Sequence, residues 1–247
     1  MGAPAKAAAT SLSERVVDLL QRVSYRRAET DEDREAIFRL RYEAYLREGA
    51  IRPAFGRRLS DAYDDLDNAW IVGVHVDGEL VSSMRIHVAT QDQPDLVAAQ
   101  IFPEYIIPEL DAGKIIVDPT RFVVDAAAAR AYPDIAYVTV RTGHMAAEHF
   151  NADLVLATVR SEHQAFYKRV FGHVAVCEPR PYLSLVKPLS LMMLDYPATR
   201  EMIARRFPFF SSTAAERAAL FGPLPDFAHR RAPAAILPRG DATALVG

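Results

Sequence analysis

Residues 70–88 read WIVGVHVDGELVSSMRIHV, two runs rich in β-branched and aliphatic residues on either side of Asp77-Gly78. An Asp-Gly pair between two such runs is a strong hairpin signal, because both residues tolerate the positive φ angles of a type I′ turn. The stretch therefore predicts two long, adjacent antiparallel strands.

Arg85 is the charged residue within the second run, and Met84 and Ile86 fall on the opposite face of the predicted strand. If helices cover both faces of the sheet, Arg85 is buried and needs a carboxylate partner. Asp64 and Asp118 are the two candidates for that partner.

Further elements extend in both directions from this hairpin. Hydrophobic periodicity predicts helices over 13–23, 30–49, 134–151 and 162–170, strands over 25–28, 114–124 and 153–160, and a last hairpin over 174–186. This order predicts an α+β protein of three layers, with a central mixed, mostly antiparallel sheet flanked by helices.

The domain organisation follows from length and composition. The chain has 247 residues, 50% hydrophobic and 25% charged, which is ordinary globular composition. We expect an N-terminal leader with a short helix over 1–24, a main domain over 25–190, and a helical C-terminal extension over 191–247 with a flexible tail. Phe207, Phe209, Phe210 and Phe221 of the extension either cover a binding tunnel or a dimer face, or pack as ordinary core.

Composition also excludes several classes of protein. Cys177 is the only cysteine, which excludes a disulfide framework and favours a reducing, cytoplasmic location. No apolar run reaches the length of a membrane span, and a net charge of −3 gives no reason to expect nucleic acid. His144 and His149 are five residues apart and do not share a helix face, so we expect no metal site.

An acidic loop precedes the hairpin and holds Asp61, Asp64, Asp65 and Asp67. Such carboxylates can bind Ca²⁺, bind an ammonium group or act as a base. An EF-hand loop that began at Asp61 would require Gly at its sixth position and Glu at its twelfth. This chain has Leu66 and Val72 there, so the loop does not match that motif. A solvated loop with Asx turns is the alternative.

The segment Asp118-Pro-Thr-Arg121 interrupts a predicted strand. Proline within a strand marks an edge or a bulge, and a bulge frees a backbone N–H that can stabilise an oxyanion. An ion pair that compensates for the strand irregularity is the alternative explanation of Asp118 and Arg121.

Several motifs occur in the order that acyl-homoserine-lactone synthases carry them on the GNAT (N-acetyltransferase-like) fold. They are Arg41-Tyr-Glu-Ala-Tyr45, Asp61-Ala-Tyr-Asp64, Ser83-Met-Arg85, Phe102 and Asp118-Pro-Thr-Arg121. The chain departs from that pattern at Asp118, which replaces a glutamate, and it lacks the expected tryptophan before the acidic loop.

These departures indicate a sister group. Residues 39–45, 166–172 and 180–182 resemble the long-chain N-acyl amino acid synthases, including N-acyltyrosine synthases, and the resemblance runs from about residue 25 to about residue 187. It implies transfer of a long-chain fatty acyl group to the α-amino group of a free amino acid. The implied donor is the acyl-phosphopantetheine of acyl carrier protein (ACP), or acyl-CoA, with no tightly bound cofactor.

The choice between these donors depends on residues 125–137. Acetyl-CoA-dependent GNAT enzymes have a glycine-containing loop for the CoA diphosphate there, and this segment contains no glycine. ACP presents only a phosphopantetheine arm. The absence of a glycine-containing diphosphate loop therefore agrees with an acyl-ACP donor. ACP is acidic, and residues 120–247 carry 15 Lys and Arg against 11 Asp and Glu. The candidate docking residues are Arg141, Arg160, Lys168 and Arg169.

The resemblance also implies roles for the motif residues. We expect Asp118, directly or through a water, to remove the proton of the amine, with Asp64 binding the ammonium group or sharing that role. Arg85 and Arg121 would order these carboxylates, or one of the two arginines would bind the carboxylate of the amino acid. The candidate substrate-binding residues are Arg41, Tyr45, Asp61, Arg85, Phe102 and the backbone of Phe122, Val123 and Val124.

Three alternatives remain open at this point. An acyl-homoserine-lactone synthase would use S-adenosylmethionine as acceptor, and an N-acetyltransferase would use acetyl-CoA. A non-catalytic lipid- or ACP-binding module is the third.

Overall fold

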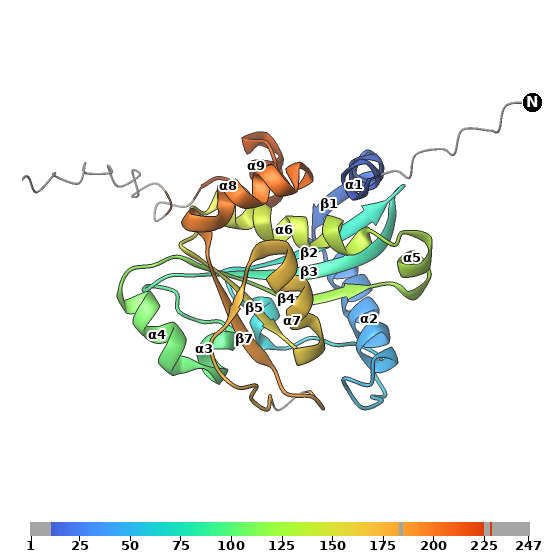
Figure 1. Ribbon diagram of the computed structural model, residues 1–247. Helices are drawn as coiled ribbons and strands as arrows, with labels where there is room; N and C mark the ends of the chain where they lie inside the picture. Colours follow the sequence, from blue (N-terminus) through green and yellow to red (C-terminus); the bar gives the residue numbers. More distant parts are fainter. Residues whose placement is uncertain (1–10, 183–184, 225–227, 229–247) are drawn as a thin grey trace, which may run out of the picture.

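The computed structural model describes residues 11–182, 185–224 and 228 of the chain. Within them, seven strands form one sheet in the order β1-β2-β3-β4-β5-β7-β6 (Figure 1). The strands are β1 (Val23–Arg27), β2 (Ala69–Val76), β3 (Glu79–Ala89), β4 (Ile116–Val124), β5 (Leu154–Val159), β6 (Val174–Ala175) and β7 (Ser190–Asp195). The predicted α+β class and the predicted hairpin of β2 and β3 are both confirmed.

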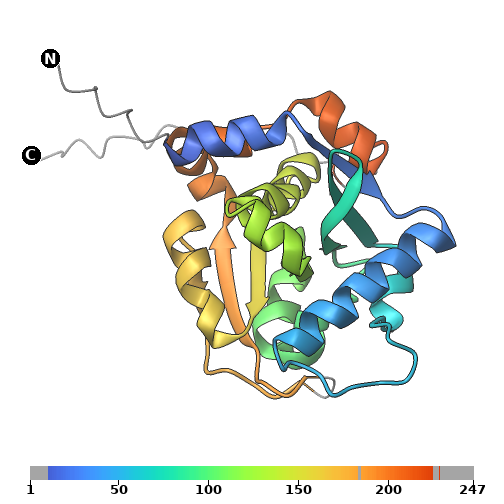
Figure 2. The ribbon, with the colours of Figure 1, turned by 90° about the vertical axis from the view of Figure 1, so that its right-hand side faces the viewer.

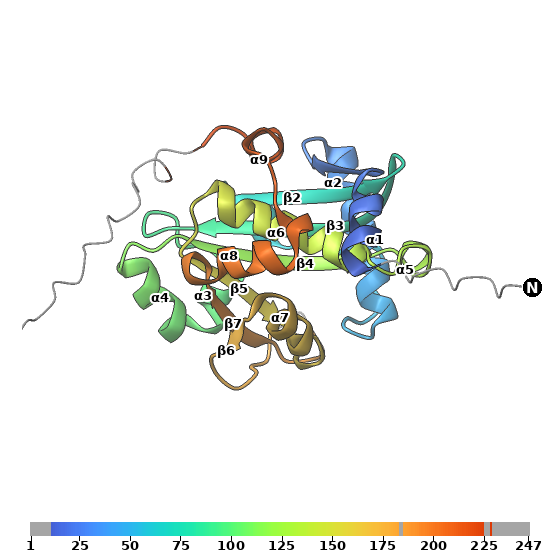
Figure 3. The same ribbon diagram turned by 45° about the horizontal axis from the view of Figure 1, so that its top comes forward.

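Helices cover both faces of the sheet. They are α1 (Leu12–Leu20), α2 (Asp31–Arg47), α3 (Val97–Ile101), α4 (Pro103–Asp111), α5 (Ala126–Ala131), α6 (Ile135–His149), α7 (Gln164–Phe171), α8 (Tyr196–Arg206) and α9 (Ala214–Phe221). Three 3₁₀ turns accompany them, η1 (Ala62–Asp65), η2 (Ser161–His163) and η3 (Pro208–Phe210). Figure 3 shows α1, α6 and α8 over the same face of the strands.

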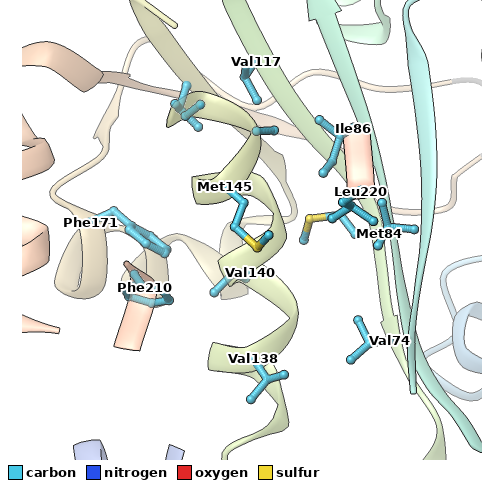
Figure 4. Close-up of a cluster of buried hydrophobic side chains, with 14 of the residues drawn as sticks. Val74, Met84, Ile86, Val117, Val138, Val140, Met145, Phe171, Phe210 and Leu220 are labelled. Carbon is cyan, nitrogen blue, oxygen red and sulfur yellow. The ribbon is translucent and has the colours of Figure 1, made fainter. Parts of the chain in front are cut away.

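The main core lies between α6 and the sheet. Met84 and Ile86 of β3 and Val117 of β4 pack there against Val138 and Met145 of α6 (Figure 4). On the opposite face, α2 packs on β2 and β3, and α3 and α4 cover a second cluster. Because both faces are covered, a polar side chain on either face is buried and requires a partner.

The sheet changes character between β4 and β5. Every other strand pair is antiparallel, whereas β4 and β5 are parallel and pair over two positions, Ile116 with Leu154 and Val117 with Val155. Both strands continue beyond these positions without pairing to each other in the described part of the chain. A gap therefore opens between them within the sheet itself.

The last hairpin differs from its prediction over 174–186. Its first strand, β6, covers two residues, and its second strand is β7, which begins at Ser190. Pro179, Pro181 and Pro188 fall between them, and proline lacks the N–H that a strand ladder requires. β7 therefore occupies the start of the segment expected to be helical.

The rest of the C-terminal extension packs on the core. Phe209, Phe210 and Phe221 are at most 4% exposed and belong to the main core cluster. The predicted leader up to residue 10 and the predicted tail lie outside the described residues. Within the described residues, no helix combines the length and apolar character that crossing a bilayer requires.

Candidate active site

A cleft of about 380 Å³ occupies the gap between β4 and β5. One wall is formed by residues 119–124 of β4, and another by Thr158 and Val159 at the end of β5. Tyr45 near the end of α2 and Tyr167 of α7 also line it. The cleft thus lies where the parallel pairing ends, a usual place for a ligand in an open sheet that contains parallel strands.

One end of the molecule brings two distant segments to this cleft. The segment that follows α2 and the one that precedes β7 lie side by side (Figure 2), and Val186 N–H donates to Ala50 O at 3.0 Å. Ala50, Leu185 and Leu189 from these segments line the cleft. They give the cleft an apolar part.

The predicted bulge in the 118–124 segment is present. Ser83 pairs with Val123 and Arg85 pairs with Thr120, so two β4 residues stand opposite one β3 residue. Arg121, one of those two, has a φ of 54°, a left-handed conformation that is uncommon for a residue with a side chain. The bulge re-aims the β4 side chains where the strand borders the cleft.

A buried network of ion pairs lies beside the cleft. Arg41 Nη1 is 2.7 Å from Asp64 Oδ1, and Arg85 Nη1 is 2.5 Å from Asp61 Oδ1 and 3.2 Å from Asp64 Oδ1. Arg121 Nη2 also pairs with Asp61. The network therefore joins α2, β3 and β4 through Asp61, which precedes η1, and Asp64, which belongs to η1. The prediction that Asp64 is a partner of Arg85 is confirmed.

The local fold of η1 fixes both aspartates. Asp61 is the N-cap of η1 and accepts from Tyr63 N–H at 3.0 Å, while Asp61 N–H donates to Asp64 Oδ2 at 2.9 Å. Burial by itself raises the pKa of Asp61, but the charges of Arg85 and Arg121 outweigh it and lower that pKa to about 2. Both carboxylates are committed to arginines.

The other two aspartates of the acidic loop, Asp65 and Asp67, are exposed. Asp65 pairs with Arg34 on the surface. In the part of the chain that the structure describes, no group of three or more His, Cys, Asp and Glu side chains could hold a metal ion.

Asp118 lies behind the wall of the cleft and is completely buried. Thr158, which lines the cleft, donates its hydroxyl to Asp118 Oδ1 at 3.3 Å, and Oδ2 has no hydrogen-bond partner within the described residues. Burial raises the pKa of Asp118 to about 6, although the charge of Arg85 opposes this rise. Asp118 forms no ion pair within the described residues, so of the two candidate partners of Arg85 the structure selects Asp64.

Other buried polar atoms around the network also lack partners in the described structure. They are Arg41 Nε and Nη2, Ser83 Oγ and His87 Nδ1. His87 stands directly opposite Asp118 in the β3–β4 register, and burial lowers its pKa to about 4, which keeps its ring neutral. Unsatisfied groups are rare in protein interiors, so each of these atoms requires a physical explanation.

The predicted substrate-binding residues fall into two sets. Tyr45, Phe122, Val123 and Val124 line the cleft together with Arg121. Arg41, Asp61 and Arg85 belong to the network and are not lining residues of the cleft. Phe102 is buried under α4, with the guanidinium of Arg180 5.1 Å from its ring centroid, so it belongs to the second core cluster.

The predicted docking residues also lie in different places. Lys168 and Arg169 are exposed on α7, and Arg160 lines the cleft while paired with Glu48 and Glu162.

Arg141, by contrast, is buried. It donates to Phe209 O at 2.9 Å and to Ser211 O at 2.6 Å, so it ties α6 to the C-terminal extension. A buried guanidinium cannot contact a docking partner, and the docking prediction for Arg141 is wrong.

Thr158 and Tyr167 are the site residues that the sequence did not indicate. Each stands on a correctly predicted element, β5 and α7, but their role depends on where β4 and β5 separate. The register between two strands brought together from distant parts of the chain carries no local sequence signal.

Two of three comparisons with known proteins found proteins that are similar to this chain. The family model of the N-acyl amino acid synthase FeeM matches residues 36–195. The structure of FeeM from uncultured soil microbes superposes with a TM-score of 0.61 at 18% identity, covering 73% of this chain and 94% of that one. No curated protein matches the chain in sequence.

Two acyl-homoserine lactone synthases share the fold. LasI has a TM-score of 0.53 at 14% identity, covering 82% of this chain and 95% of its own, and the CoA-dependent BjaI has 0.53 at 15%, covering 80% and 97%. These structures share the predicted fold, a mixed, mostly antiparallel sheet flanked by helices. Because the family model matches more than half of its length, the chain belongs to the N-acyl amino acid synthase FeeM family of N-acyltransferases.

Proposed function

We propose that the protein transfers a long-chain fatty acyl group from acyl-ACP to the α-amino group of a free amino acid. The observation that carries the proposal is the juxtaposition of the cleft with Asp118, whose carboxyl is reached from the cleft through the Thr158 hydroxyl. The family supports the reaction type, and the single free thiol Cys177 and the ACP partner support a cytoplasmic location.

The acceptor amine must lose a proton before it can react. An α-amino group has a pKa of about 8 and is mostly protonated at neutral pH. In our proposal one ammonium proton passes to Thr158 Oγ1 as the Thr158 proton passes to Asp118 Oδ1. With a pKa of about 6, Asp118 is largely ionised at pH 7 and remains basic enough to accept it.

The free amine then attacks the thioester carbonyl. The new C–N bond gives a tetrahedral intermediate, and its collapse breaks the C–S bond and releases the phosphopantetheine thiolate. The second amine proton goes to the sulfur, and Asp118 returns its proton to solvent. Backbone N–H groups after the bulge, over 122–124, would stabilise the oxyanion.

Arg121 is the group that we assign to the carboxylate of the amino acid. The buried network contains three guanidinium groups, Arg41, Arg85 and Arg121, against the two carboxylates of Asp61 and Asp64. Of these arginines, Arg121 lines the cleft. A substrate carboxylate there would accept paired hydrogen bonds from its guanidinium group.

The N-terminus of α5 supports ACP over CoA as donor. Asp125 caps this helix, and its Oδ1 accepts from Ala127 N–H at 2.8 Å and Ala128 N–H at 2.9 Å. A helix N-terminus capped by a carboxylate has fewer free N–H groups and less positive potential for a diphosphate. The exposed cations Lys168 and Arg169 on α7 suit an acidic carrier protein.

The first experiment is mass spectrometry of lipids from cells that express the protein or the Asp118→Asn variant. Long-chain N-acyl amino acids that appear with the protein and are lost with the variant would support the proposal and identify both substrates. New acyl-homoserine lactones would instead indicate a lactone synthase. Absence of any new acylated amine, with the protein folded, would contradict the proposal.

The donor is tested with purified protein. We expect kcat/KM to be higher with acyl-ACP than with acyl-CoA carrying the same chain. The double variant Lys168→Glu/Arg169→Glu should raise KM for acyl-ACP at least tenfold and leave the reaction with acyl-CoA unchanged. An equal loss with both donors would show that these cations do not bind ACP.

A further inference from the structure

A second, smaller cavity of about 30 Å³ lies deeper in the molecule, between α6, α7 and the sheet. Its lining includes Met84, Val140 and Phe171, which belong to the main core (Figure 4). Two residues, Pro119 and Tyr167, line both this inner cavity and the cleft. They form the wall between the two spaces.

We propose that Tyr167 limits the length of the acyl chain by closing the inner end of the cleft against this cavity. The proposal rests on the proposed function, because it concerns the acyl group of that reaction. An acyl chain that enters along Phe122 and Phe166 meets the phenol ring before it can reach Val140 or Phe171.

The Pro119 side of this wall cannot move aside. A Cβ atom on Gly143 of α6 would be 2.8 Å from Pro119 Cγ and 3.3 Å from Pro119 Cβ. The proline ring therefore packs directly on the glycine backbone, with no flexible side chain between strand and helix. Pro119 is the fixed half of the wall.

The Tyr167 side is a single side chain held by its neighbours. Its ring makes edge contacts with Phe166, at a centroid distance of 5.3 Å, and with His173, at 5.6 Å, and a tilted contact with Phe171 at 6.3 Å. These contacts hold the ring in one orientation. Truncating this ring would join the two spaces while the strand and the helix stay in place.

The inner cavity is suited to receive the end of a longer chain. Met84, Val140 and Phe171 are apolar, and burying each additional methylene favours the longer chain by about 0.8 kcal/mol, or about fourfold. Removing the tyrosine ring should therefore shift chain-length preference upwards by several carbons.

The test is a competition in one reaction. The enzyme receives an equimolar mixture of saturated acyl donors from C8 to C20 with a single amino acid, and mass spectrometry gives the product ratios. Tyr167→Ala should move the most abundant product to a longer chain. It should also raise the amount of the longest product, relative to the next longest, by at least fourfold. Tyr167→Phe keeps the ring and should retain the original distribution.

Val140→Ala is the matched control. It enlarges the inner cavity behind an intact wall, so alone it should leave the distribution unchanged, whereas with Tyr167→Ala it should extend the preference further. A longer optimum in Val140→Ala alone would overturn the assignment of Tyr167, as would an unchanged distribution in Tyr167→Ala.

The experiment separates this inference from the proposed function. If the unaltered enzyme forms no N-acyl products, the proposed function fails; if it forms them and Tyr167→Ala gives the same ratios, the length limit alone fails. Product ratios within one reaction do not depend on how much enzyme is folded. If Tyr167→Ala yields no folded protein, Tyr167→Leu gives the same test with a smaller expected shift.

Discussion

Arg41 Nη1 donates a hydrogen bond to Asp64 Oδ1 at 2.7 Å, and neither side chain is more than 1% exposed. This pair joins α2 to η1 across the face of the sheet. Removing one partner leaves the other charge buried without compensation, which costs about 3–5 kcal/mol. We therefore expect Asp64→Asn to lose about that much free energy of unfolding, as measured by urea denaturation.

Asp65→Asn is the control for that measurement. Asp65 is the next residue, but its side chain is 75% exposed and pairs with Arg34 on the surface. An exposed pair contributes at most about 1 kcal/mol. Equal losses in the two variants would contradict a stabilising role for the buried network.

Asp118→Asn should change stability and activity in opposite directions. In the folded protein burial raises the pKa of Asp118 from 3.8 to about 6. This group therefore opposes folding at every pH at which its carboxyl is ionised in the unfolded chain. The penalty is complete above pH 6 and absent below about pH 4. Its size is about 3 kcal/mol.

The variant removes this penalty together with the proposed base. We expect Asp118→Asn to be more stable than the unaltered protein at pH 8, with the gain vanishing as the pH falls towards 4, while N-acylation is lost. Thermal unfolding across this pH range is the measurement. A variant that is destabilised at pH 8 would show that the ionised carboxylate supports the fold.

Thr158→Val tests the path between the cleft and Asp118. The hydroxyl lowers the pKa of Asp118, and in our proposal it carries the proton, so its loss should reduce kcat by about 10²-fold and move the acidic limb of kcat/KM above pH 6. Thr158→Ser keeps the hydroxyl and should restore both. If Thr158→Val alters KM and leaves kcat unchanged, Thr158 binds the substrate and does not carry the proton.

Gly143→Ala should destabilise the fold by about 1–3 kcal/mol. The added methyl group would meet Pro119 Cγ at 2.8 Å, and neither the proline ring nor the helix backbone can yield cheaply. Gly56→Ala is the comparison, because its new Cβ meets nothing closer than Arg58 Cγ at 3.9 Å. Thermal denaturation of the two variants measures the difference.

The local structure could be predicted well from the sequence. The β2–β3 hairpin follows from Asp77-Gly78, and α2 begins after Thr30, which forms a capping box with Asp33. The bulge at Arg121 followed from Pro119. In each case, a few neighbouring residues suffice to specify the backbone.

The site was predicted less completely. The motif residues Asp61, Asp64, Arg85 and Arg121 do meet, but the pairing of Arg85 with Asp61 depends on the path of the loop before η1.

Arg141 looked like a surface cation on a helix and is instead buried by the C-terminal extension. Such outcomes depend on contacts between segments far apart in the chain, which hydrophobic periodicity does not describe.

Trp70 lies where the C-terminal extension meets the sheet. Its ring packs 4.8 Å from that of Phe150 and 6.4 Å from that of Phe221, and its indole N–H donates to Phe221 O at 3.2 Å. It is also the only tryptophan in the sequence. The tryptophan fluorescence of the protein therefore comes from one indole at this junction, and its emission maximum reports whether α9 is seated on the sheet, without any added label.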